Sequence, residues 1–260
     1  MDDVERVLKL TMNSPFDKAI YLPNENAKVG ILLLHAYTGS AKDMNLLGRH
    51  LHKLGYSVLC PNFSGHWTNN IFDILNASPL TWLEEAQAAY DWLKSQAFDK
   101  VFVFGLSMGG IMATALMTKP ENGIAGGGTF NSPVVTVDKT DVSEAFMGYA
   151  QHLARSTQSL QQFELDEAKI YAAHWEQMKE LEQVKQSIKA VLSNIDQAFY
   201  IAQSAKDELI EADDVYEFQD ELVNAKIDFH WFPENTHVIT VNPDRVDFEN
   251  SVIRFLADNA

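Results

Sequence analysis

The stretch VFVFGLSMGG at residues 101–110 joins a predicted strand to a predicted helix through a sharp turn. Its first four residues are strong β formers, and a G-x-S-x-G motif centred on Ser107 follows directly. The residues after the serine, as far as Met117, are apolar and rich in Ala and Met, which is typical of a helix buried against a sheet. A serine on such a turn projects its hydroxyl from the end of the strand. Because a serine hydroxyl is a weak nucleophile alone, Ser107 is a candidate nucleophile that requires a nearby base.

Short apolar runs alternate with amphipathic segments on both sides of this turn. The run VGILLLH is apolar throughout, as expected for a strand that is buried on both faces. Alternation of this kind predicts βαβ units and a mostly parallel sheet, and therefore an α/β fold. The predicted strands cover residues 29–35, 56–60, 101–104, 129–135, 198–202 and 227–232, and the predicted helices cover residues 44–54, 83–93, 108–117, 214–223 and 244–257.

The alternation stops between residues 138 and 195, where no strand-like run occurs. This segment is charged and has helical spacing, as shown by the apolar residues Tyr171, Trp175, Met178 and Leu181. A long strand-free insertion in an α/β frame is best interpreted as a helical cap. We therefore predict a cap at residues 138–195, inserted into a core formed by residues 1–137 and 196–260.

The composition of the 260 residues is that of an ordinary globular protein, with 46% hydrophobic residues. The formal net charge of −16 argues against binding to nucleic acid or to anionic membrane surfaces. Acidic residues are dense at 164–182 and 207–221, which predicts solvated helix faces. The single cysteine, Cys60, ends an apolar run, which predicts a buried small hydrophobe. The acidic N-terminus lacks an apolar signal segment and no run is long enough to span a bilayer, so we expect a cytoplasmic protein.

Polar residues follow the last two predicted strands, at the edge where the functional groups of a parallel sheet gather. The sequence QSAKD ends at Asp207 after one strand, and PENTH ends at His237 after the next. His237 is therefore the candidate base for Ser107, and Asp207 is the candidate acid that orients the imidazole. The order Ser, Asp, His is that of hydrolases with a strained serine turn. Asp207 is better placed than the competing acidic residues, which are Asp196, Glu208, Asp213 and Asp214.

Other chemical groups in the sequence give weaker signals. His50 and His52 lie two residues apart on a predicted helix and point in different directions, so we expect no metal site there. The run Gly126–Gly128 lacks the Lys and Ser/Thr of a phosphate-binding loop, and close packing is the simpler interpretation. A tetrahedral intermediate requires two hydrogen-bond donors for its oxyanion, and the backbone amide of Met108 is one candidate. The second donor should come from the loop at residues 35–40.

Four stretches form a combined pattern: LLLHAYTGSAKDMNLLGRHLHKLGYSVLCPNFSGH, FVFGLSMGG, AKDELI and NTHVIT. Together they resemble the small bacterial carboxylesterases related to monoacylglycerol lipases, within the α/β-hydrolase superfamily. The resemblance covers the chain from about residue 28 to its end. It implies an α/β-hydrolase fold with a helical cap after the sixth core strand, and ester hydrolysis through an acyl-enzyme without cofactor or metal. In that family the loop usually reads H-G-F-T-G and the amide of its aromatic residue completes the oxyanion hole, which assigns this role to Tyr37.

The sequence departs from the family pattern at three places. Ala36 replaces a glycine, residues 64–67 read SGHW, and residues 235–237 read NTH instead of the usual SGH. These changes affect the shape of the substrate site more than its chemistry. The candidate substrate-lining residues are His66 and, on the inner face of the cap, Phe146, Met147, Tyr149 and Trp175.

The leading hypothesis for function is a serine carboxylesterase that acts on short- to medium-chain acyl esters. An apolar pocket beneath a cap favours a small, uncharged acyl ester as the substrate. A monoacylglycerol lipase, a thioesterase or a feruloyl-type esterase would use the same three residues, and so would a peptide-bond hydrolase. A non-catalytic ligand-binding member of the fold is the alternative from another class, but it predicts a damaged triad.

Overall fold

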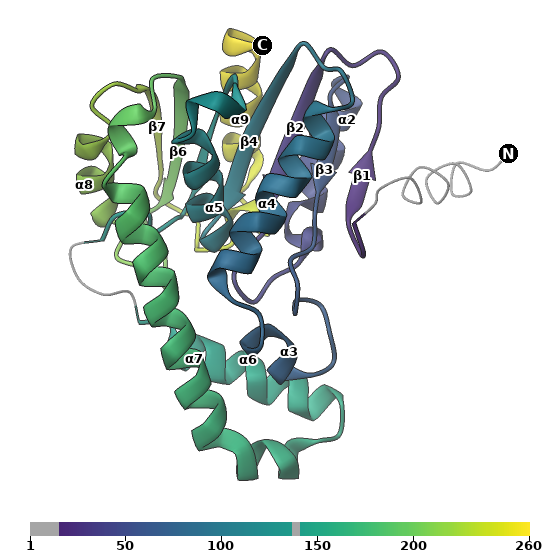
Figure 1. Ribbon diagram of the computed structural model, residues 1–260, viewed down its shortest axis with the longest axis vertical. Coiled ribbons are helices and arrows are strands. Elements are labelled where there is room, and N and C mark those ends of the chain that lie inside the picture. Colours follow the sequence, from purple (N-terminus) through teal and green to yellow (C-terminus); the bar gives the residue numbers. More distant parts are fainter. Residues whose placement is uncertain (1–15, 137–140) are drawn as a thin grey trace, which may run out of the picture.

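The computed structural model describes residues 16–136 and 141–260, which form a seven-stranded sheet flanked by helices (Figure 1). The sheet has the strand order β1-β3-β2-β4-β5-β6-β7. Only β1 is antiparallel, and it pairs with β3 at one edge. The strands are β1 (Ile20–Leu22), β2 (Val29–Leu34), β3 (Ser57–Cys60), β4 (Lys100–Leu106), β5 (Gly126–Phe130), β6 (Ala198–Ser204) and β7 (Lys226–Phe232).

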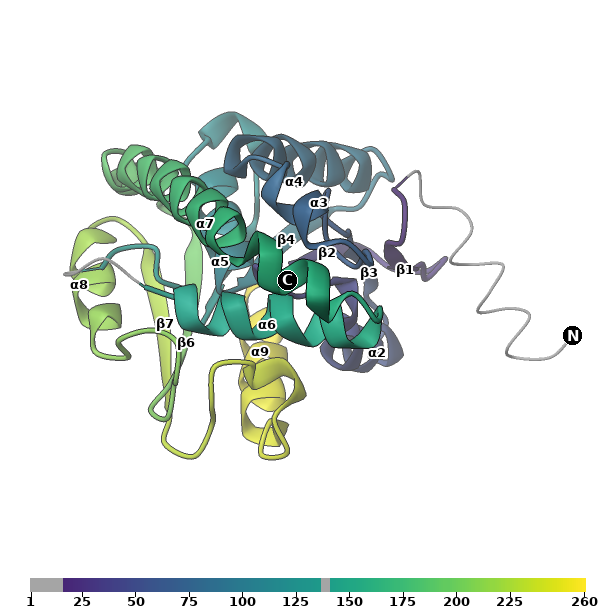
Figure 2. The same cartoon turned by 90° about the horizontal axis from the view of Figure 1, so that it is seen from below.

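Helices cover both faces of the sheet (Figure 2). Side chains of β2 alternate between the faces: Leu32 joins the cluster beneath α4 and α5, whereas Leu33 joins the cluster beneath α2 and α9. Both faces are buried, which explains why this strand is apolar throughout. The helices are α2 (Asn45–Lys53), α3 (Ile71–Leu75), α4 (Pro79–Lys94), α5 (Met108–Met117), α6 (Ser143–Ser156), α7 (Leu160–Lys189), α8 (Asp214–Glu221) and α9 (Val246–Asn259).

The predicted α/β fold is confirmed, and two details of the strands differ from the expectation. The strand expected at residues 129–135 is β5 and begins three residues earlier, within the glycine run. A Cβ atom would lie 1.9 Å from the Val103 carbonyl oxygen at Gly127 and 1.8 Å from the Tyr200 carbonyl oxygen at Gly128. The neighbouring strands therefore approach too closely for side chains, and the run serves close packing, as predicted. The strand β1 was not predicted, because it is only three residues long.

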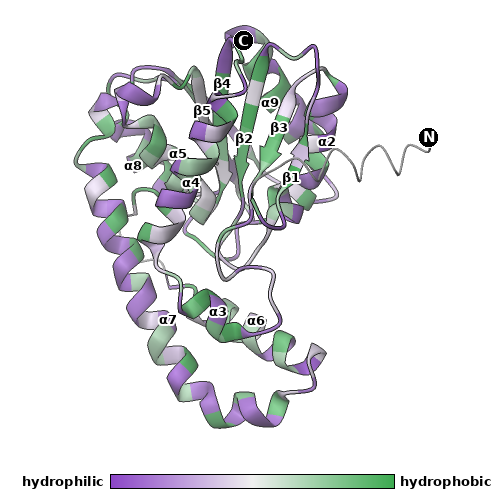
Figure 3. Cartoon of the chain, turned by 45° about the vertical axis from the view of Figure 1, so that its right-hand side comes forward, coloured by the Kyte–Doolittle hydropathy of each residue, from purple (hydrophilic) through white to green (hydrophobic). Residues whose placement is uncertain are grey.

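The helices α6 and α7 lie between β5 and β6 and form the helical insertion, which we define as residues 141–195. Among the described residues it follows the fifth strand of the sheet. The 30-residue helix α7 runs from the tip of the insertion back to the flank of the sheet (Figure 1). Hydrophobic residues alternate with polar ones along it, whereas β2 and β3 are almost wholly hydrophobic (Figure 3). The predicted boundary between residues 137 and 138 lies outside the described residues.

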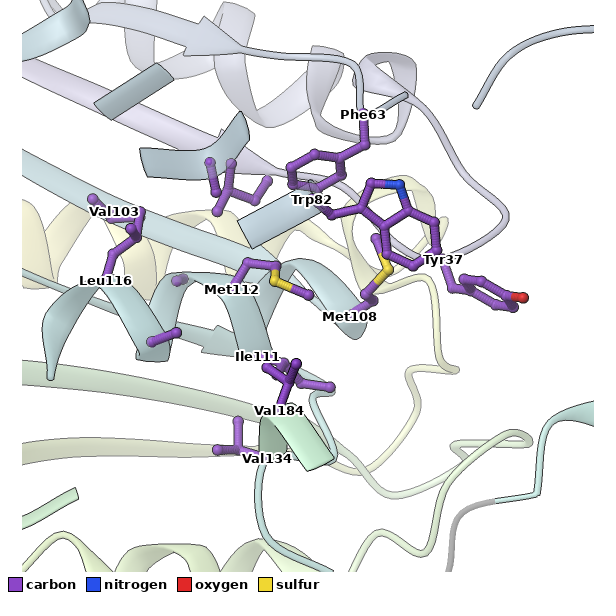
Figure 4. Close-up of a cluster of buried hydrophobic side chains, with 14 of the residues drawn as sticks. Tyr37, Phe63, Trp82, Val103, Met108, Ile111, Met112, Leu116, Val134 and Val184 are labelled. Atoms are coloured by element: carbon purple, nitrogen blue, oxygen red, sulfur yellow. The ribbon is translucent and has the colours of Figure 1, made fainter. Parts of the chain in front are cut away.

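The buried clusters connect the insertion to the sheet. Figure 4 shows Ile111 of α5 near Val184 of α7, and both belong to one hydrophobic cluster. Cys60 is fully buried, as predicted, and burial raises the pKa of its thiol. Among the described residues, no helix is long and apolar enough to cross a membrane.

Candidate active site

Ser107 occupies the turn between β4 and α5 and has the backbone angle φ +52°, in the left-handed region that non-glycine residues rarely adopt. Its amide donates a hydrogen bond to the Phe130 carbonyl oxygen at 2.9 Å. A Cβ atom at Gly105 would lie 2.0 Å from the Gly109 carbonyl oxygen, and one at Gly109 would lie 2.2 Å from the Leu34 carbonyl oxygen. Glycine at both positions therefore permits the tight turn. The strain is concentrated at the serine itself, as in functional sites of other proteins.

Asp207 and His237 are in direct contact after the ends of β6 and β7. His237 Nδ1 lies 2.9 Å from Asp207 Oδ1 and 2.8 Å from Oδ2, and both side chains are buried. The Asp207 carboxylate also accepts hydrogen bonds from the amides of Leu209 and Ile210 at 3.0 and 3.1 Å. An ionised Asp207 accepts the Nδ1 proton of His237, which leaves Nε2 as the basic nitrogen of the neutral ring.

Two further residues hold the backbone of the loop that carries His237. The His237 amide donates to Glu208 Oε2 at 3.0 Å, and the buried Asn131 side chain donates to the His237 carbonyl oxygen at 2.7 Å. Glu208, which competed with Asp207 on sequence grounds, therefore contacts the backbone of this loop while Asp207 contacts the imidazole.

Ser107 and His237 line the same cavity, which has a volume of about 300 Å³. Met108 and Tyr37, the candidate oxyanion donors, line it as well. The cavity also receives Asp43 from the turn after β2. The helical insertion contributes its own wall, formed by Phe146 and by Met178, Leu181, Glu182 and Lys185 of α7.

Two buried histidines hold the loop at residues 35–40. The Phe63 amide donates to His35 Nε2 at 3.0 Å, so the ring proton lies on Nδ1, which donates to the Ala36 carbonyl oxygen at 2.8 Å. His66 Nε2 forms a short hydrogen bond with the Tyr37 carbonyl oxygen. Burial lowers the pKa of His66 to about 4 and that of His35 well below its ordinary value, so both rings are neutral near pH 7.

Asp43 supports the same loop from the cavity side. One of its carboxylate oxygens accepts the Ser40 amide at 3.2 Å and also leaves no room for a side chain at Gly39. Burial raises the pKa of Asp43 to about 6, although hydrogen bonds from the backbone of Ser40 and Ala36 act in the opposite direction. The loop is therefore fixed by two neutral imidazoles and one carboxyl group.

The side chain of Tyr37 connects this loop to the helical insertion. Its hydroxyl donates to Gln177 Oε1 and lies 3.1 Å from His174 Nδ1, which must then carry the ring proton. Gln177 Nε2 donates to the carbonyl oxygens of Ile74 and Ala77 at 2.8 and 2.6 Å. Burial lowers the pKa of His174 to about 4. The hydroxyl that distinguishes Tyr37 from the usual phenylalanine of the family pattern is thus tied to α7.

The structure corrects several of the residues predicted to line the substrate site. Phe146 lines the cavity and stacks on the His174 ring at a centroid distance of 4.3 Å. Met147 instead packs on the hydrophobic core, and Trp175 is 39% exposed. Each follows an inward-facing residue by one position, and a rotation of about 100° per residue turns it away from the cavity. His66 is 2% exposed and positions the Tyr37 backbone rather than lining the cavity.

Tyr149, the remaining cap residue predicted to lie on the inner face, is half-buried. Its ring lies 6.4 Å from that of Phe146, and it is not part of the cavity wall.

Two charged residues of the wall, Glu182 and Lys185, were missed because the charged stretch around them was interpreted as a solvated helix face. Their spacing relative to Met178 and Leu181 places all four on one side of α7, and this periodicity is the signal that could have found them. Within residues 16–136 and 141–260, no group of three His, Cys, Asp or Glu side chains is arranged to hold a metal ion.

The mostly parallel sheet, with a strained serine turn after a central strand and a carboxylate–imidazole pair at the same end, is that of an α/β hydrolase. Within that class, the family model described as serine aminopeptidase, S33 matches residues 25–244, and the chain belongs to this family.

Named relatives are consistent with this assignment. The chain is 26% identical to a carboxylesterase of Bacillus subtilis (strain 168) over 231 residues, which cover 87% of this chain and 91% of the relative. It is 38% identical to a thermostable monoacylglycerol lipase of Bacillus sp. (strain H-257) over 92 residues, or 35% of this chain and 36% of the lipase. A solved structure of metagenome-derived lipolytic enzymes, LipS and LipT, superposes with a TM-score of 0.70 at 18% identity and covers 94% of this chain and 98% of its own. The family match and the sequence relatives support a carboxylic ester hydrolase, and the solved structure has the same fold.

Proposed function

We propose that the protein is a serine carboxylesterase in which Ser107 is the nucleophile, His237 the general base and Asp207 the residue that orients the imidazole. The observation that carries this proposal is the buried Asp207–His237 pair, which shares one cavity with a serine held at φ +52°. A non-catalytic member of the fold would have no need to maintain this strained serine beside a paired imidazole.

In the proposed reaction, Ser107 Oγ attacks the ester carbonyl carbon while its proton passes to His237 Nε2. The carbonyl oxygen becomes an oxyanion and accepts hydrogen bonds from the backbone amides of Tyr37 and Met108. Asp207 stabilises the imidazolium that forms. The tetrahedral intermediate then collapses, the alcohol leaves with the proton from His237, and an acyl-enzyme remains. A water molecule, deprotonated by His237, hydrolyses the acyl-enzyme and regenerates the serine.

The size and lining of the cavity support short- to medium-chain acyl esters as substrates. Its volume of about 300 Å³ lies at the lower end of the range for small-molecule sites, and most of its wall is apolar. Monoacylglycerols, thioesters and feruloyl esters have the same reacting carbonyl group and are the alternative substrates. No step of the proposed mechanism uses a cofactor or metal.

The test is hydrolysis of p-nitrophenyl butyrate by the wild type and by Ser107→Ala. The variant is expected to lose a factor of about 10⁴–10⁶ in kcat, because the serine and histidine act as a unit. The exposed Ser193→Ala provides the matched control and should retain wild-type activity. A fluorophosphonate probe should label the wild type and Ser193→Ala but not Ser107→Ala.

A substrate panel then separates the possible reactions. The substrates of the panel are attacked by the same nucleophile but differ in their acyl and leaving groups. They are simple esters, monoglycerides, thioesters, a feruloyl ester and an aminoacyl p-nitroanilide. The p-nitroanilide is included because the matched family is described as aminopeptidases. Undiminished ester turnover by Ser107→Ala would rule out Ser107 as the nucleophile.

A further inference from the structure

The insertion wall of the cavity contains an ion pair between a buried lysine and a partly exposed glutamate, and the proposed reaction does not use it. Lys185 Nζ lies 3.0 Å from Glu182 Oε2 and donates to Thr136 Oγ1 at 3.0 Å. Lys185 is only 5% exposed, although both members of the pair line the cavity. The other lining residues of the insertion are apolar, and Met178 and Leu181 lie next to the pair on α7.

The pair has unused hydrogen-bonding capacity. A lysine ammonium has three N–H donors, and two are directed to Glu182 and Thr136. In the part of the chain that the structure describes, no partner is recorded for the third donor or for the second carboxylate oxygen of Glu182. Before a substrate binds, water can satisfy both groups.

A substrate that fills the cavity must replace this water. An apolar chain would leave a buried ammonium donor without a partner, and such a group carries a desolvation penalty. A neutral hydroxyl group can accept from Lys185 and donate to Glu182 at the same time. A carboxylate would be attracted by Lys185 but repelled by Glu182, and the chain carries a net charge of −16.

We propose that Lys185 and Glu182 form a binding subsite for a neutral hydroxyl group carried by the ester substrate, on either its acyl chain or its alcohol. The proposal rests on the proposed function and narrows its substrate class. Sites that are built to hydrogen-bond a substrate hydroxyl discriminate against analogues that lack it, because their own polar groups are then left unpaired.

The experiment compares matched esters with and without a terminal hydroxyl. For the acyl side, p-nitrophenyl 6-hydroxyhexanoate and 8-hydroxyoctanoate are compared with the hexanoate and octanoate. For the alcohol side, 3-hydroxypropyl hexanoate is compared with propyl hexanoate. The readout is the ratio of kcat/KM for the hydroxylated and plain esters, because loss of a merely structural contact between α7 and Thr136 would affect both esters alike.

In the wild type we expect a ratio of about 10 on the side that reaches the pair, which corresponds to one hydrogen bond to a charged group. Lys185→Met should bring the ratio close to 1, and Glu182→Gln should reduce it about threefold. Lys189→Met is the matched control, because Lys189 lies one turn further along α7, is exposed and pairs with Glu217 and Glu221. That variant should keep the wild-type ratio.

A wild-type ratio near 1 on both sides, or a ratio that Lys185→Met leaves unchanged, overturns the proposal. Preferential hydrolysis of mono-p-nitrophenyl adipate over the hydroxyhexanoate also overturns it, because the subsite would then bind an anion. If Lys185→Met does not fold, as judged by circular dichroism, Glu182→Gln decides, and an unchanged ratio in that variant is a negative result. If the kcat/KM ratio shows no preference for hydroxylated esters, the subsite proposal fails but the esterase proposal remains intact. Ester turnover that survives Ser107→Ala refutes the esterase mechanism and this subsite with it.

Discussion

The two walls of the cavity are built in different ways. On the sheet side, Ser107, Asp207 and His237 lie on turns directly after strands, and hydrogen bonds donated by backbone amides to carbonyl or carboxylate oxygens fix each turn. On the insertion side, the wall is formed by one face of α7 together with Phe146 and its neighbours at the start of α6, and the side chains of these helices decide what it presents. The comparison indicates that the proposed reacting groups are positioned by the ends of the strands, whereas the groups on the insertion side can change without altering the sheet.

The largest effect on the sheet side is expected from a comparison of substitutions at two adjacent acidic residues, Asp207 and Glu208. Asp207→Asn removes the charge that stabilises the imidazolium and permits the wrong tautomer, so kcat should fall by about 10³–10⁴. Glu208→Gln alters only a contact to the His237 backbone amide and should cost less than about tenfold. Both variants are measured with p-nitrophenyl butyrate. Equal losses in the two variants would contradict the assignment of Asp207.

Residues on the sheet side of the cavity could be predicted from the sequence, whereas the charged residues on the insertion side could not. The proximity of Asp207 and His237 could be predicted because the ends of parallel strands converge, and strands are recognisable as short apolar runs. Lys185 and Glu182 could not, because charged residues on a helix are usually solvated and burial of this face depends on the tertiary packing of α7. His66 was placed in the correct region but given the wrong role, since its contact with the Tyr37 carbonyl depends on the fold of two separate loops. The cytoplasmic location stays a prediction.

A weaker effect concerns pH, because the three histidines that contact the Tyr37 loop or the Tyr37 hydroxyl are buried and have lowered pKa values. His66 and His174 have pKa values lowered to about 4, so the unfolded chain binds protons first as the pH falls from about 6.5 to 4. Asp43, with its pKa raised to about 6, has the opposite sign: the folded chain binds its proton first, which adds stability as the pH falls through 6 towards 4. His35, whose pKa is also lowered by burial, acts in the same direction as the other two histidines, so the histidines outweigh the one acid.

We therefore expect the free energy of unfolding to decrease by at least about 2 kcal/mol between pH 7 and pH 5, as measured by urea denaturation. Asp43→Asn removes the compensating group, and the decrease in this variant should be about 1 kcal/mol larger. A smaller decrease in Asp43→Asn than in the wild type would show that the sign assigned to Asp43 is wrong.

The smallest expected effect concerns the stability of α6 in the helical insertion. Gly148 is exposed within α6, and a Cβ atom there would have no heavy atom within 4 Å. Gly148→Ala should raise the free energy of unfolding by about 0.5–1 kcal/mol, because alanine is the better helix former. Urea denaturation measures the gain, and kcat/KM should remain within about twofold of the wild type. A loss of stability would mean that this helix is more constrained than its open surroundings indicate.

Tyr37 belongs to both walls at once, since its backbone lies in the loop beside Ser107 while its hydroxyl is bound to Gln177 of α7. The insertion is therefore not an interchangeable module. A chimera that receives residues 141–195 from a relative without a hydrogen-bond acceptor at position 177 would leave the Tyr37 hydroxyl without this partner, unless position 37 were exchanged together with the graft. Recombination among members of this family must carry residue 37 and the helix as one unit.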